Sequence, residues 1–154
     1  MFADRGDNTM QMRRRRSGQV WNIGTASLLL AMGACSSAAD MTASRHAVEM
    51  FHFELDQANY AQIWKDTANE MRAAIPEAGL TKLLAAVHTK LGKVAETREV
   101  NWNVNYNTGG TFVTVTMHTR FDHGTGDETF VFKPAGTDAK LVGYHINSLD
   151  MMTL

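Results

Sequence analysis

Two places in the chain bring together side chains that can perform acid–base chemistry. Asp56 and Tyr60 are four residues apart, at helical spacing, and Trp64 follows four residues later. Tyr144 and His145 are neighbours in an apolar segment. A carboxylate beside a phenol or imidazole can take up and return a proton, as small isomerases and dehydratases require. Aromatic residues at this spacing are also typical of a packed helix face, and we favour that interpretation.

The histidines do not predict a metal site. His118 and His145 fall on the second and fourth predicted strands, which places their backbones roughly 10 Å apart at normal strand spacing. One zinc ion would need both imidazoles within about 2.1 Å. No carboxylate or third histidine lies at ligand spacing, and no cofactor motif is present, so we expect neither metal nor cofactor. His46 and His52 fall outside the apolar stripe of their helix and are predicted to lie on the surface.

A polar, uncharged face is predicted on the first two strands. The first strand alternates between asparagines and the apolar side chains Val100, Trp102, Val104 and Tyr106, which are expected to be buried. The other face of the strand pair is a candidate surface for a second copy of the chain or another partner, although a solvated face is the simpler interpretation. Its members are Asn101, Asn103, Asn105, Thr114, Thr116 and His118.

The only cysteine, Cys35, ends a short apolar run near the N-terminus. Four arginines at 13–16 precede the run, and Met32-Gly33-Ala34 supplies small residues beside the cysteine, as in a secretion signal. The pattern resembles the lipobox of bacterial lipoproteins, with Met32 where leucine is usual. That resemblance implies cleavage before Cys35, lipidation of its thiol and a membrane anchor. Ser36 in the next position implies sorting to the outer membrane, with the domain facing the periplasm.

The predicted organisation is a signal peptide at 1–35, a tether at 36–43 and a folded domain at 44–150. Residues 1–11 are polar, so Met10 and Met12 are alternative translation starts. Residues 1–35 carry a net charge of +3, whereas residues 36–154 carry ten basic and fourteen acidic side chains. A mildly acidic domain lacks the basic face that phosphate backbones require, so nucleic acid is not an expected partner.

Periodicity predicts an α+β domain of three helices followed by a four-stranded antiparallel meander. Asn59 and Gln62 suggest a capping box at the second helix, Pro76 ends that helix, and Gly92 caps the third. The predicted helices span 42–58, 59–75 and 77–91, and the strands span 94–106, 112–121, 128–133 and 141–149.

This order resembles the cone-shaped fold of nuclear transport factor 2 and ketosteroid isomerase, and more closely a group of uncharacterised exported bacterial proteins. The resemblance covers about residues 44–150. It is carried by L-G-K-V at 91–94, N-W-N-V-N-Y at 101–106, G-T-F-V-T-V-T at 110–116 and L-V-G-Y-H-I-N-S at 141–148. It implies three helices packed on a curved sheet, but no catalytic residues, because a fold does not determine a function.

The function expected from these observations is that of a non-enzymatic envelope lipoprotein that binds a small ligand or a protein. The alternatives are a small isomerase or dehydratase that uses the cone pocket, with Asp56, Tyr60, Tyr144 or His145 inside it, and a structural homodimer.

Overall fold

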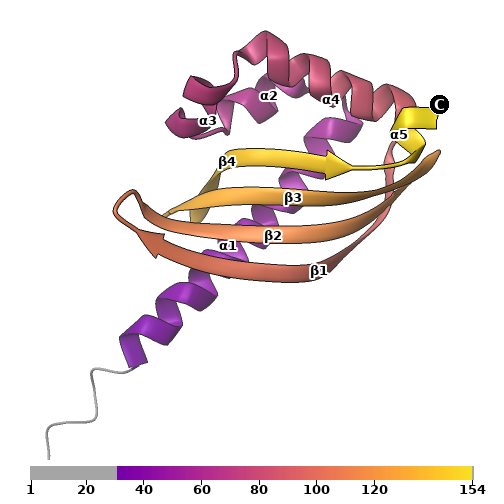
Figure 1. Ribbon diagram of the computed structural model, residues 1–154. Helices are drawn as coiled ribbons and strands as arrows, with labels where there is room; N and C mark the ends of the chain where they lie inside the picture. Colours follow the sequence, from indigo (N-terminus) through magenta and orange to yellow (C-terminus); the bar gives the residue numbers. More distant parts are fainter. Residues whose placement is uncertain (1–30, 154) are drawn as a thin grey trace, which may run out of the picture.

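The computed structural model describes residues 31–153, with side chains from residue 37 onward. The described part of the chain is an α+β fold in which helices cover one face of an open, four-stranded antiparallel sheet (Figure 1). Four helices precede the sheet and a short one follows it, instead of the three predicted. The elements are α1 (Ala31–Asp56), α2 (Tyr60–Lys65), α3 (Asn69–Ala74), α4 (Glu77–Leu91), β1 (Val94–Asn107), β2 (Gly110–Phe121), β3 (Gly124–Ala135), β4 (Asp138–Asn147) and α5 (Asp150–Thr153).

The sheet is the predicted meander, with strand order β1-β2-β3-β4. Two-residue turns join the strands, and Gly136 in the last turn has a φ of 72° that favours glycine. Because each strand pairs with its neighbour in sequence, β1 and β4 are the two edges. A register shift between Glu99 and Asn101 divides β1 into two halves.

Helix α1 is longer than predicted, because it begins at Ala31 and includes the expected tether at 36–43. Residues 36–57 contain no glycine or proline, so nothing in this segment breaks a helix. Met41 and Ser44 are buried, and the Ser44 hydroxyl donates a hydrogen bond to the carbonyl of Asp40. Helix α1 therefore enters the core without a flexible approach.

The predicted second helix, at 59–75, is two short helices separated by residues 66–68. The break occurs because this segment joins the edge of β4. The Ala68 N–H donates to the Leu141 carbonyl at 2.8 Å, and the Leu141 N–H donates to the Asp66 carbonyl at 3.2 Å. The predicted capping box does not form, since the Asn59 side chain donates to Glu54 instead.

The core lies between the helices and the inner face of β2, β3 and β4. Val113, Val115 and Met117 of β2 are buried on that face, as the alternation predicts. The expectation for β1 was wrong: Val100, Trp102 and Tyr106 are 45, 50 and 64 % exposed. The helices lie mainly over the other three strands, which leaves the inner face of this edge strand largely open. The remaining large members of the core are Met41, Val48, Phe51, Leu55, Ile63, Met71, Leu80, Leu84, Val87, Leu91, Phe121, Phe130, Phe132 and Leu141.

Candidate binding groove and buried polar cluster

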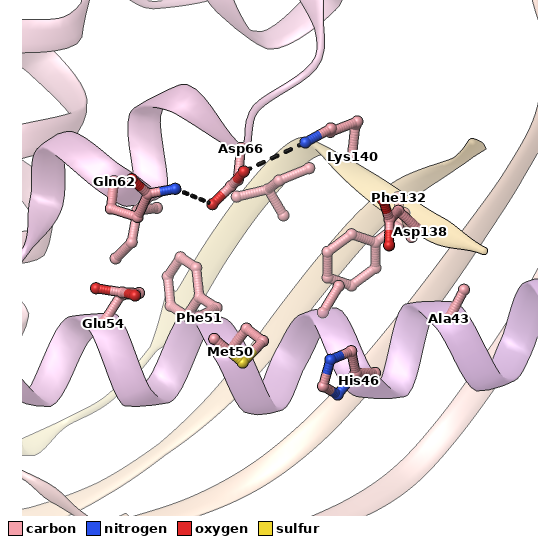
Figure 2. Close-up of a pocket in the computed structure, with 14 residues that line it drawn as sticks. Ala43, His46, Met50, Phe51, Glu54, Gln62, Asp66, Phe132, Asp138 and Lys140 are labelled. Carbon is pink, nitrogen blue, oxygen red and sulfur yellow. Dashed lines mark hydrogen bonds and ion pairs between the residues drawn. The ribbon is translucent and has the colours of Figure 1, made fainter. Parts of the chain in front are cut away.

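An open groove lies between α1, α2 and the beginning of β4 (Figure 2). Its floor is apolar and includes the buried side chains Phe51, Ile63, Phe132 and Leu141. Helix α1 contributes small side chains, which keep the space open; Ala47 is one of them. The volume is about 250 Å³, slightly below the usual range of small-molecule sites. A groove of this size suits a compact apolar ligand or a single inserted side chain.

Polar side chains form the rim of the groove. Gln62 donates to Asp66 at 2.9 Å, and the Lys140 ammonium lies 3.2 Å from the other oxygen of the same carboxylate. Figure 2 shows this chain of contacts above the α1 residues. Glu54 and Asp138 add two more carboxylates to the rim. The arrangement can orient a ligand by hydrogen bonds while the apolar floor holds its body.

A separate cluster of polar side chains is buried around Glu128 of β3, which is fully buried. One carboxylate oxygen accepts a hydrogen bond from the Tyr144 hydroxyl at 2.7 Å. The other lies 2.8 Å from Nε2 of His52 and 2.5 Å from the Thr119 hydroxyl. The Thr97 hydroxyl continues the network to Thr119 at 2.9 Å. These contacts satisfy a carboxylate that would otherwise be costly to bury.

The electrostatics of this cluster keep Tyr144 protonated. Burial of the phenol raises its pKa well above the ordinary value, and the charge of Glu128 and the hydrogen bond to it act in the same direction. Tyr144 is therefore a hydrogen-bond donor at neutral pH. Within the described residues, no buried side-chain nitrogen or oxygen lacks a partner. The cluster thus acts as a satisfied internal network.

A second hollow of about 270 Å³ lies on the opposite side of α1, against β1. Thr97 lines it and so connects the Glu128 cluster to the surface. Arg45 and Glu99 also line it and form a two-pronged ion pair at 2.8 and 2.9 Å. The hydrogen bond from Arg45 lowers the pKa of Glu99. This pair joins α1 to β1.

The structure separates the four predicted acid–base residues. Asp56 accepts a hydrogen bond from the Val94 N–H at 2.9 Å, and so holds the start of β1. The Tyr60 hydroxyl lies 3.2 Å from Nδ1 of His88, and burial raises its pKa. Tyr144 contacts Glu128, whereas His145 is exposed on the outer face of the sheet. None of the four lines the groove or the second hollow.

The candidate binding residues of the first two strands lie together on the outer face of the sheet. Asn101 is opposite Thr116, and Asn103 is opposite Thr114. Asn105 is opposite Phe112 and His118 is opposite Arg98, so the face is not purely polar and uncharged. His118 lies 2.7 Å from Asp127 of β3. That this face binds a partner stays a prediction.

The backbone of Cys35 belongs to α1, but its side chain lies outside the described residues, as do residues 1–30 of the predicted signal peptide. Among the residues that the structure describes, no helix is both long and apolar enough to span a membrane. The same part of the chain contains no group of three or more histidine, cysteine or acidic side chains arranged for a metal ion.

Sequence reasoning missed Glu128 and misplaced His52. The prediction that His46 is exposed is confirmed, but His52 is 5 % exposed and contacts Glu128. A signal for Glu128 was present, because it alternates with Phe130 and Phe132 on the apolar face of β3. An acidic residue at such a position requires hydrogen-bond partners when the strand is covered. The partners come from distant parts of the chain, and the pattern does not identify them.

The chain matches one protein family, described as "Protein of unknown function (DUF4019)", over residues 47–144. The match begins within α1 and ends within β4, so it includes the Glu128 cluster and the groove walls apart from Ala43 and His46. No curated protein matches the chain.

Proposed function

The chain belongs to the DUF4019 family, and we propose that it is a non-enzymatic envelope lipoprotein whose groove binds a small, partly apolar ligand. The description of the family assigns no activity, so the proposal rests on the groove. The supporting observation is the groove itself, with its apolar floor, polar rim and open side. The predicted acid–base residues support binding over catalysis, since none of them faces the groove and three are engaged in internal hydrogen bonds.

The anchor is the second part of the proposal. The arginine run, the apolar run and Met32-Gly33-Ala34-Cys35 resemble a lipobox, and lipidation at Cys35 would hold the domain on the outer membrane, facing the periplasm. Stable anchoring requires more than one acyl chain, which a lipidated N-terminal cysteine supplies. We also propose that the helices and the open sheet form a cone of the nuclear-transport-factor-2 type, with the groove at its mouth.

Native mass spectrometry of the protein, extracted from membranes in mild detergent, tests the binding function. We expect bound mass that is lost on denaturation. Ala47→Leu places a larger side chain in the groove and should abolish that mass, whereas Ala78→Leu, at an exposed position of α4, should retain it. Equal bound mass in both variants would refute the groove as the binding site. If the unmodified protein carried no bound mass, the expectation of a co-purified ligand would be wrong.

Membrane fractionation tests the anchor. Cys35→Ser removes the thiol that receives the lipid and should release the protein from the membrane fraction. A variant that stays with the membrane as fully as the unmodified protein would contradict lipidation at Cys35. The two tests are independent, because the groove lies inside the described domain and the cysteine lies near the beginning of α1.

A further inference from the structure

The half of β1 nearest the β1–β2 turn has an unusual surface. From Val100 to Met117, through the turn and most of β2, the sequence contains no Asp, Glu, Lys, Arg or His. Within this stretch Trp102 is 50 % exposed and Tyr106 is 64 % exposed. Large exposed aromatic residues on an uncharged half of an edge strand are typical of a contact surface, because a sheet edge is normally protected by charge or proline.

Trp102 and Tyr106 lie on the same side of the sheet as α1. Trp102 is paired with Val115, a buried residue of the inner face, and Tyr106 follows four residues later on the same side. Helix α1 crosses this face, and its N-terminal part extends beyond the β1 edge (Figure 1). The Arg45–Glu99 ion pair fixes the crossing beside the aromatic half of β1.

The same helix carries Cys35. Ten residues separate Cys35 from Arg45, which corresponds to roughly 15 Å along a helix at about 1.5 Å per residue. The polar interface on each side of a bilayer is roughly 5–8 Å deep. A lipid on Cys35 would therefore hold the β1 edge close to the headgroups, and inclination of α1 would bring the edge into them.

We propose that Trp102 and Tyr106 insert into the headgroup region of the membrane and hold the domain with its β1 edge against the bilayer. The proposal rests on the lipid anchor of the proposed function. Tryptophan and tyrosine favour this region because each combines an apolar ring with a polar group that stays hydrated. The β1 edge therefore forms a second membrane contact beside the acyl chains.

The charge of the surface defines the lipid. The stretch from Val100 to Met117 has no basic side chain, and the neighbouring cations are paired with carboxylates, Arg45 with Glu99 and Lys133 with Glu70. The contact therefore has no net positive charge to attract anionic headgroups and suits zwitterionic ones such as phosphatidylcholine or phosphatidylethanolamine. Docking should accordingly be insensitive to salt, because screening weakens charge interactions and leaves apolar insertion unchanged.

Tryptophan fluorescence in vesicles tests the proposal. The lipidated protein is reconstituted in phosphatidylcholine vesicles with and without brominated acyl chains, which quench nearby indoles. The chain has three tryptophans, and Trp21 lies in the segment removed by cleavage before Cys35. The variant Trp64→Phe reports on Trp102, and Trp102→Phe reports on Trp64 of α2, which lies across the molecule from the β1 edge (Figure 1).

The expected result is a blue shift of Trp102 emission on reconstitution and loss of its intensity with brominated lipid, at low and high salt, while Trp64 emission is unchanged. If the protein floats with the vesicles but Trp102 is not quenched, the proposed docking is wrong and the lipid anchor still stands. Failure of the protein to float with vesicles would overturn the anchor and the docking together. A blue shift that depends on protein concentration in detergent, without vesicle quenching, would overturn docking in favour of a second copy at this edge.

Discussion

Substitution of Glu128 tests how much the buried polar cluster contributes to the free energy of unfolding. The substitution Glu128→Met keeps a side chain of similar length but removes both carboxylate oxygens. His52 and Tyr144 then lose their partner in a buried environment. Thr119 keeps its hydrogen bond with Thr97 at 2.9 Å, so its hydroxyl still has a partner.

The magnitude follows from the number of orphaned groups. A buried donor or acceptor without a partner costs about 1–3 kcal/mol, so two of them cost about 2–6 kcal/mol in free energy of unfolding. We therefore expect Glu128→Met to destabilise the fold by about 2–6 kcal/mol.

Urea unfolding followed by circular dichroism measures this change by linear extrapolation. Glu99→Met is the matched control, because Glu99 also lies on the inner face but pairs with Arg45, whose side chain is half exposed. That variant should lose no more than about 1 kcal/mol.

The double variant Glu128→Met/Tyr144→Phe tests whether the loss of stability comes from a hydroxyl left without a partner. Removing the stranded hydroxyl should leave the double variant no less stable than Glu128→Met alone, since neighbouring residues of one network are not additive. Losses that simply add, or a loss below about 1 kcal/mol for Glu128→Met, would refute the network as a source of stability.

Three further changes test local features. The raised pKa of Tyr144 means that the folded protein holds the phenol proton more tightly than the unfolded chain does. The stability of the fold is therefore full below about pH 10 and falls as the pH rises further. In urea titrations at alkaline pH, Tyr144→Phe should reduce that fall. Gly92→Ala places a Cβ 2.8 Å from Asp122 at a φ of 82° and should cost about 1 kcal/mol or more, measured as a lower urea midpoint. Thr67→Val removes a 2.7 Å hydrogen bond to the Trp64 carbonyl and should lower the thermal midpoint, by about 1 kcal/mol of stability; an unchanged midpoint in either variant would contradict these local explanations.

The sheet could be predicted from sequence because its determinants are local. Alternation with a period of two and short turns define a meander without knowledge of distant contacts. The burial of β1 could not be predicted in the same way. Trp102 and Tyr106 alternate correctly, but whether a helix covers them depends on how α1 crosses the sheet. Alternation therefore identifies a face and does not say what covers it.

Neither the interruption between α2 and α3 nor the Glu128–His52 contact could be predicted, because both depend on residues far apart in the sequence. Thr67 and Leu141 pair across 74 residues, and His52 meets Glu128 across 76. Helical periodicity continues through residues 66–68, because local preference contains no information about a strand edge that forms later in the chain. The groove is of the same kind, since its walls come from three elements.

The bridge between Thr67 and Leu141 also makes the two edges of the sheet unequal. The backbone of residues 66–68 pairs with β4 at Leu141, where an additional strand would otherwise pair, whereas β1 has no such neighbour in the described part of the chain. A strand that added along the whole of β4 would have to displace this bridge, whereas a strand that added to β1 would displace no such bridge in that part of the chain. The short interruption in the helices therefore disfavours extension of the sheet through β4, and with it the growth of long assemblies by edge pairing.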